Sequence, residues 1–148
     1  MRRQLLILRS SASNEFRWRK YTLASQPNEF HNQTIEYALR SAADDAVARD
    51  EFERAIRAQT ILGYYHLRAR GLEEANAAAD LALALAQKSP GKWAPAVGEA
   101  WHLRGRIFST ERSIQAGAHL REAQRLFETV GSRTLINEVR RDLEKLAE

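Results

Sequence analysis

The chain has 148 residues, of which 44% are hydrophobic and 28% are charged, a composition typical of one folded domain. It contains no cysteine, which excludes disulfides, thiolate catalysis and cysteine-bound metals and favours a cytoplasmic location. The apolar run Leu5–Leu8 is too short for a secretion signal or a membrane helix. We therefore expect a cytoplasmic protein without a membrane partner.

The positive charge is concentrated at the N-terminus. The first 27 residues carry six basic groups and one acidic group, whereas residues 28–148 carry 17 basic and 18 acidic groups. We expect a basic arm over residues 1–25 and a helical domain over 26–148. The arm residues that could contact nucleic acid or a second subunit are Arg17, Trp18, Arg19 and Lys20. Packing of the arm's aromatic rings on the first helices is the third interpretation, and all three stay open.

Capping signals place the first two helices. Ser25 and Pro27 predict the start of a helix over residues 26–47. Asp50 is the expected N-cap of a second helix over 51–69, with Glu53 reaching back to complete the cap. Gly71 is the expected left-handed residue after that helix.

Four more helices follow in the pattern of apolar residues, and no segment alternates like a strand. The expected ranges are 72–87 before a Ser-Pro-Gly turn, 95–108 with Pro95 in its first turn, 113–130 ended by Gly131, and 134–147. The sequence therefore predicts an all-α fold of about six helices.

A repeat of 41 residues relates two parts of this helical region. It pairs Leu62 with Leu103, Ala75 with Ala116, Ala77 with Ala118, Ala82 with Ala123 and Leu85 with Leu126. Repeats of this length indicate stacked helical hairpins. We expect repeat units over about 50–90 and 91–131, with the helices 26–47 and 134–147 as caps that cover the ends of the stack.

The repeat resembles the tetratricopeptide repeat. The first unit carries Leu62-Gly63 followed by Ala75, Ala79 and Ala82, and has His66 where the family usually shows a tyrosine. The second unit carries Leu103, Ile107, Ala116, Leu120 and Ala123, with Arg104 in place of the glycine and Gly105 one position late. The period is closer to the repeats of about 40 residues in bacterial maltose-activator-type regulators than to the usual period of about 34. The resemblance covers about residues 50–131 and implies antiparallel hairpins stacked as a short right-handed solenoid.

The sequence offers little support for catalysis. The four histidines, His31, His66, His102 and His119, show no metal-binding spacing. No glycine-rich phosphate loop or Gly-x-Ser-x-Gly motif is present, and the acidic residues 44–53 lack the pattern of a calcium loop. We expect a chain that is not an enzyme and needs neither a cofactor nor a metal.

Recognition of another protein is the expected role. In a tetratricopeptide-like array the first helix of each hairpin lines the concave surface. The predicted partner-binding residues on that surface are Arg57, Thr60, Tyr64 and Arg68 on one helix, and Trp101, Arg104 and Phe108 on the next. Arginines beside aromatic rings suit a peptide with apolar anchors and acidic flanks. The simpler interpretation is that Trp101 and Phe108 pack between hairpins and that the arginines are solvated.

The expected function is thus a non-catalytic protein–protein interaction module, a scaffold, adaptor or sensor part of a bacterial regulatory protein. The terminal-carboxylate clamp of some family members is absent, because Thr60 and Tyr64 stand at the matching positions. Two alternatives remain. One is a nucleic-acid-associated module that uses the basic arm, and the other is a self-assembling repeat protein in which the arm pairs two chains.

Overall fold

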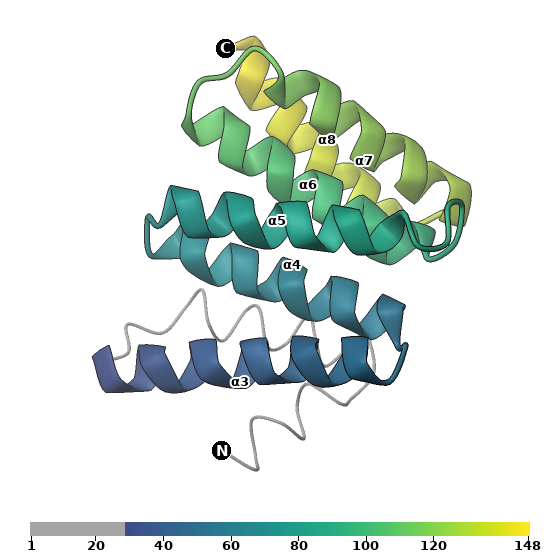
Figure 1. Ribbon diagram of the computed structural model, residues 1–148. Coiled ribbons are helices and arrows are strands. Elements are labelled where there is room, and N and C mark those ends of the chain that lie inside the picture. The colour runs from purple at the N-terminus through teal and green to yellow at the C-terminus, as the bar shows by residue number, and fades with distance from the viewer. Residues whose placement is uncertain (1–28) are drawn as a thin grey trace.

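The computed structural model describes residues 29–148, with side-chain surroundings from Thr34 onward. The predicted arm over 1–25, with Arg17, Trp18, Arg19 and Lys20, lies outside this range, as does the expected helix start at 26–28. The described residues form six helices (Figure 1): α3 (Glu29–Ala48), α4 (Phe52–Arg68), α5 (Leu72–Ala86), α6 (Ala94–Thr110), α7 (Ala116–Val130) and α8 (Arg133–Ala147). Over these residues the predicted all-α fold is confirmed.

The helices stack in the order of the sequence. Each helix packs on the next, from α3 on α4 to α7 on α8, and Figure 1 shows them layered from α3 to α8. In addition α4 packs on α6 and α6 contacts α8, whereas no comparable packing joins α3 to α5 or α5 to α7. We call α4, α6 and α8 the inner row, and α3, α5 and α7 the outer row. The described chain is a short stack of helical hairpins.

Four of the described helices end in the same way. A residue one or two positions beyond the helix takes a left-handed conformation, with φ values of 57° at Asp50, 62° at Arg70, 55° at Arg112 and 70° at Gly131. After α4, for example, the Gly71 N–H donates to the carbonyl of His66 at 2.8 Å, the bond typical of a Schellman motif. The prediction for Gly131 is confirmed. The prediction for Gly71 is wrong, since Gly71 has φ −83° and Arg70 takes its place.

The predicted N-cap at Asp50 is also wrong. Only residues 49–51 separate α3 from α4, so Asp50 is used to close the preceding helix. Glu51 becomes the N-cap of α4, and no side chain completes the cap. Pro95 lies in the first turn of α6, as predicted.

The repeat has two registers. Buried residues of α5 recur 41 positions later in α7, in the pairs Ala75–Ala116, Ala79–Leu120, Ala82–Ala123 and Ala86–Phe127. The inner helices α4 and α6 are instead 42 residues apart at both ends. Gly63 therefore corresponds to Gly105 and not to Arg104, which corrects the pairing of Leu62 with Leu103 by one residue. The second unit retains the glycine of the repeat.

The two hairpins fill equivalent space with side chains of reversed size. In the first hairpin Ile56 of α4 packs in one cluster with Ala86 of α5. Forty-two residues after Ile56 stands Gly98, and a Cβ there would lie 2.6 Å from the ring of Phe127, the equivalent of Ala86. The large side chain is on the inner helix in the first hairpin and on the outer helix in the second, so close packing is kept in both.

We predict that Gly105→Ala lowers the free energy of unfolding by about 1–3 kcal/mol. The added Cβ would lie 2.5 Å from Leu120 Cδ2 and 3.3 Å from the Leu120 backbone nitrogen, so α6 and α7 would have to separate. Urea unfolding followed by circular dichroism measures the change. The control is Gly117→Ala, where the nearest atoms belong to the guanidinium of exposed Arg121 at 3.5 Å or more. That control should leave stability unchanged or raise it by up to about 1 kcal/mol, and equal losses in both variants would contradict the prediction.

Candidate functional site

Two of the predicted partner-binding residues on α4 are buried. Thr60 is 1% exposed and Tyr64 is 4% exposed, and the Thr60 hydroxyl donates to the Ile56 carbonyl at 2.8 Å. The guanidinium of Arg106 on α6 lies 5.7 Å from the centre of the Tyr64 ring. The expectation that Thr60 and Tyr64 face a partner is therefore wrong. The reason is that the next inner helix covers this face of α4, which helical spacing alone does not reveal.

The other two α4 candidates are closer to the surface. Arg68 is exposed at the end of the helix. Arg57 is half-buried and pairs with Glu53 at 3.2 Å, one turn earlier, while its other terminal nitrogen lies 3.9 Å from Glu99 on α6. Arg57 thus connects two inner helices, and the α4 candidates as a group form no continuous binding face.

The three α6 candidates do come together, with one histidine of α7. The Trp101 ring stacks on His119 with centroids 5.2 Å apart and an angle of 17°, and Phe108 meets His119 edge-on at 4.7 Å. The Arg104 guanidinium lies 5.6 Å from the centre of the Phe108 ring. We call Trp101, Arg104, Phe108 and His119 the aromatic patch. All four side chains are partly exposed.

The aromatic patch lies on the outer side of the stack. His119 belongs to α7, and Arg104 pairs at 2.9 Å with Asp80 of α5, so the patch sits where two outer helices flank α6. The prediction that Trp101, Arg104 and Phe108 share a concave face with the α4 candidates is therefore wrong. Their packing between hairpins agrees with the simpler interpretation of the sequence, although their partial exposure keeps them accessible.

Two polar atoms of the aromatic patch lack partners. Arg104 Nε and His119 Nε2 are both buried without a hydrogen bond. Burial, and then the neighbouring charge of Arg104, lower the pKa of His119, which favours the neutral imidazole at pH 7. The patch thus combines aromatic faces, a guanidinium with an unused donor and a ring nitrogen without a partner. Such a set can bind an apolar group that carries a hydrogen-bonding or anionic neighbour.

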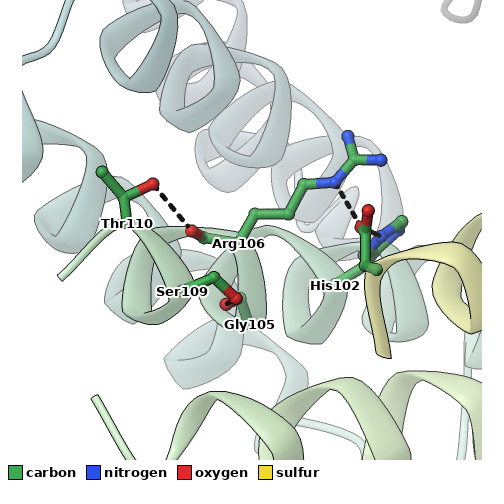
Figure 2. Close-up of polar contacts among 6 residues, drawn as sticks. His102, Gly105, Arg106, Ser109 and Thr110 are labelled. Carbon is green, nitrogen blue, oxygen red and sulfur yellow. Dashed lines mark hydrogen bonds and ion pairs between the residues drawn. The ribbon is translucent and has the colours of Figure 1, made fainter. Parts of the chain in front are cut away.

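A second cluster lies on the inner side and joins α6 to α8. Asp142 Oδ2 is 2.6 Å from His102 Nε2 and accepts a hydrogen bond from Arg106 Nε at 2.7 Å; dashed lines in Figure 2 mark both contacts. His102 is only 2% exposed. The hydroxyls of Ser109 and Thr110, also drawn in Figure 2, donate to backbone carbonyls of their own helix. The geometry is that of an ion-pair network that fixes the last helix.

The sequence shows no metal-binding spacing at His102 and gives no indication of its two partners. Asp142 lies 40 residues from His102 and 36 from Arg106, so no local motif connects them. The only available signal is an acidic residue beside the apolar stripe of the 134–147 helix. This signal is not selective, because Glu138 adjoins the stripe as well as Asp142.

The contacts of Asp142 with His102 and Arg106 lower the pKa of Asp142. Burial by itself raises this pKa, but hydrogen bonds from His102 and Arg106 outweigh that effect and bring it from 3.8 to about 2. The charged form of Asp142 therefore stabilises the folded chain. This contribution is present above the unfolded pKa near 4 and is lost as the pH falls through about 2.

Residues 34–148 contain neither a three-ligand metal cluster nor a membrane-spanning helix. No group of three histidine, aspartate or glutamate side chains in this range is arranged to hold a metal ion. None of the helices described is long and apolar enough to cross a bilayer.

A comparison of the chain with protein-family models, curated proteins and solved structures finds no significant match.

We predict that Asp142→Asn flattens the acid limb of the stability curve. Between about pH 4 and pH 2 the wild type should lose about 1–2 kcal/mol more unfolding free energy than the variant, a figure discounted for the partial exposure of the pair. At neutral pH the variant should be less stable, because the common acceptor of Arg106 and His102 loses its negative charge. Urea unfolding at a series of pH values measures both effects. Glu144→Gln, an exposed residue of the same helix, is the control and should behave like the wild type.

Proposed function

We propose that the chain is a non-catalytic helical-repeat module that binds another protein, and that the aromatic patch is its main contact. The observation that carries this proposal is the patch itself. It places two partly exposed aromatic rings and an arginine of α6 side by side, next to His119 of α7. Aromatic residues, Trp above all, and Arg contribute much of the binding energy of protein interfaces.

The chemistry of the patch suggests the partner. Asp80 holds one terminal nitrogen of Arg104, while Arg104 Nε stays without a hydrogen bond. A carboxylate or carbonyl oxygen of a partner would satisfy that donor, and an apolar side chain would pack on the rings of Trp101 and Phe108. The proposed ligand is therefore a peptide or protein segment with an apolar anchor beside an acidic or carbonyl group.

The finer part of the proposal is a scaffold, adaptor or sensor role in a cytoplasmic bacterial regulatory protein. The resemblance to tetratricopeptide repeats and the stacked hairpins of the described chain support it. The alternatives, nucleic-acid binding and pairing of two chains through the arm, depend on residues 1–25, and the described residues offer no observation in their favour.

We predict that a protein partner isolated with the full chain will depend on the aromatic patch. Trp101→Ala and Arg104→Gln should each weaken its affinity about tenfold or more, as measured by calorimetry. Ile114→Ala is the control, because Ile114 is 99% exposed and lies outside the patch. Thermal unfolding of each variant establishes that the fold is retained.

Two outcomes would contradict the proposal. One is a partner whose affinity changes by less than about twofold in both patch variants. The other is binding that disappears after nuclease treatment and falls steeply as the salt rises from about 50 to 200 mM. The second outcome would support the nucleic-acid alternative instead.

A further inference from the structure

A cleft of about 220 Å³ opens between α3, α4 and α5, one hairpin before the aromatic patch. Its floor is α4, which contributes Gln59, Leu62 and His66, and its rims carry Asp44 of α3 and Glu74 of α5. The cleft is smaller than the roughly 300–1,000 Å³ of sites for drug-sized molecules. It has the size of a single long side chain.

The cleft occupies the same place in its hairpin as the aromatic patch does in the next. The register of 42 residues for inner helices and 41 for outer helices relates Gln59 to Trp101, Leu62 to Arg104, His66 to Phe108 and Ala78 to His119. The cleft and the aromatic patch thus lie in two equivalent grooves, the first over α4 and the second over α6. In the second groove Trp101, Arg104, Phe108 and His119 contact one another and fill the space. Three of their four counterparts in the first groove are distinctly smaller, and the fourth, His66, is a ring of similar size. The first groove is therefore hollow.

Two hydrogen-bonding atoms in the cleft are buried without partners. They are Gln59 Oε1 and His66 Nε2, and His66 as a whole is 7% exposed. The nearest acid, Glu36, lies 3.8 Å from His66 Nε2, beyond hydrogen-bond distance. A buried polar atom without a partner is energetically unfavourable, and the equivalent positions around the aromatic patch carry a phenyl ring and an indole. The two unpartnered atoms, Gln59 Oε1 and His66 Nε2, therefore indicate that a ligand supplies the missing hydrogen-bond donors.

The protonation state of His66 defines which donor fits. Burial is the main cause that lowers the pKa of His66. The charge of Glu36 opposes this shift, and smaller effects come from Arg40, which lowers the pKa, and Glu74, which raises it. The neutral imidazole with its proton on Nδ1 presents Nε2 as an acceptor. Gln59 Oε1 is also an acceptor. A ligand that satisfies both must therefore carry at least two N–H or O–H donors.

The charges around the cleft favour a cation. Arg40, the only basic residue that lines it, is held by Glu36 at 2.8 Å. Asp44 and Glu74 are exposed on opposite rims and leave an excess of negative charge. The apolar wall includes Leu62 and Leu81, and Leu81 is 53% exposed, so a ligand with an alkyl stem would cover it.

We propose that this cleft binds an alkyl cation, a guanidinium or ammonium group on a short apolar stem such as an arginine or lysine side chain carries. Its N–H groups donate to Gln59 Oε1 and His66 Nε2, its charge lies between Asp44 and Glu74, and its stem packs on Leu62. In the next groove the chain's own Arg104 guanidinium packs between Asp80 and Phe108, a related contact of a guanidinium with an acid and a ring. The proposal goes beyond the proposed function and does not depend on it.

The test is a titration of the ¹⁵N-labelled full chain with butylguanidinium, followed by NMR. We expect saturable shifts centred on residues 59, 66 and 78, with a Kd of about 1 mM or tighter. Butylurea, which has the same shape without the charge, and butyrate, which has the opposite charge, should bind at least about tenfold more weakly. Absence of saturable shifts, or equal binding of the neutral compound, overturns the proposal.

Neighbouring acidic residues supply matched controls. Asp44→Asn and Glu74→Gln should weaken the binding of butylguanidinium at least about threefold, whereas Asp45→Asn and Glu73→Gln, exposed residues outside the cleft, should not. Equal losses in both members of a pair would show attraction by the overall charge only, which overturns the site.

A variant that replaces the His66 imidazole by an apolar ring provides the independent check. His66→Phe installs the residue of the equivalent position, Phe108, and removes the unpartnered Nε2, so it should abolish binding without lowering the melting temperature. A His66→Phe chain that still binds overturns the proposal. Trp101→Ala should bind butylguanidinium normally, which separates failure of this site from failure of the aromatic patch.

Two sources of the cation are distinguished by a second probe, a blocked Gly-Arg-Gly tripeptide. Binding of the tripeptide about as tightly as butylguanidinium identifies a protein side chain as a ligand that the cleft admits. Binding of the free compound alone identifies a small molecule. Binding of neither overturns the proposal.

Discussion

Close approach of neighbouring helices at glycines of the inner row is the constraint on which the rest of the structure depends. Gly63 and Gly105 occupy the same position of successive hairpins, where a Cβ would collide with a neighbouring helix. The gap left by such glycines lets the side chains of the adjacent helix reach the core, so the hairpins keep close packing although their other residues differ. At Gly98 the absence of a side chain likewise leaves room for the buried ring of Phe127. The stack is therefore held by complementary volumes more than by a repeated set of side chains.

The two sides of the stack use this scaffold differently. On the inner side the helices contact one another, and polar residues are consumed in links between them: Arg57 approaches Glu99, and Asp142 joins His102 and Arg106. On the outer side the helices of successive hairpins stand apart and leave a groove over α4 and another over α6. The grooves differ in content, because one is filled by the aromatic patch and the other is hollow. Variation between repeats therefore appears where the surface is accessible, which is where binding chemistry would be expected.

Several features of the candidate site could not be predicted from the sequence, for reasons of geometry. Helical spacing correctly placed Trp101, Arg104 and Phe108 on one face of one helix, but it did not state which neighbour that face meets. Thr60 and Tyr64 look like a polar surface stripe, yet the next inner helix covers them. The contact of Asp142 with His102 spans 40 residues, and only the packing of α8 on the stack brings the two together.

What the sequence by itself determined was the helical class, the approximate helix ranges, the end of α7 at Gly131 and the 41-residue period of the outer helices, because these follow from local periodicity and backbone preference. The tertiary structure alone decided the 42-residue register of the inner helices, the side of the stack on which the arginines and aromatic rings lie, and the hollow groove beside His66. Those features depend on how neighbouring helices cover one another. Side-chain volume and helix contact are pairwise properties of distant residues, and a pattern along one chain does not contain them.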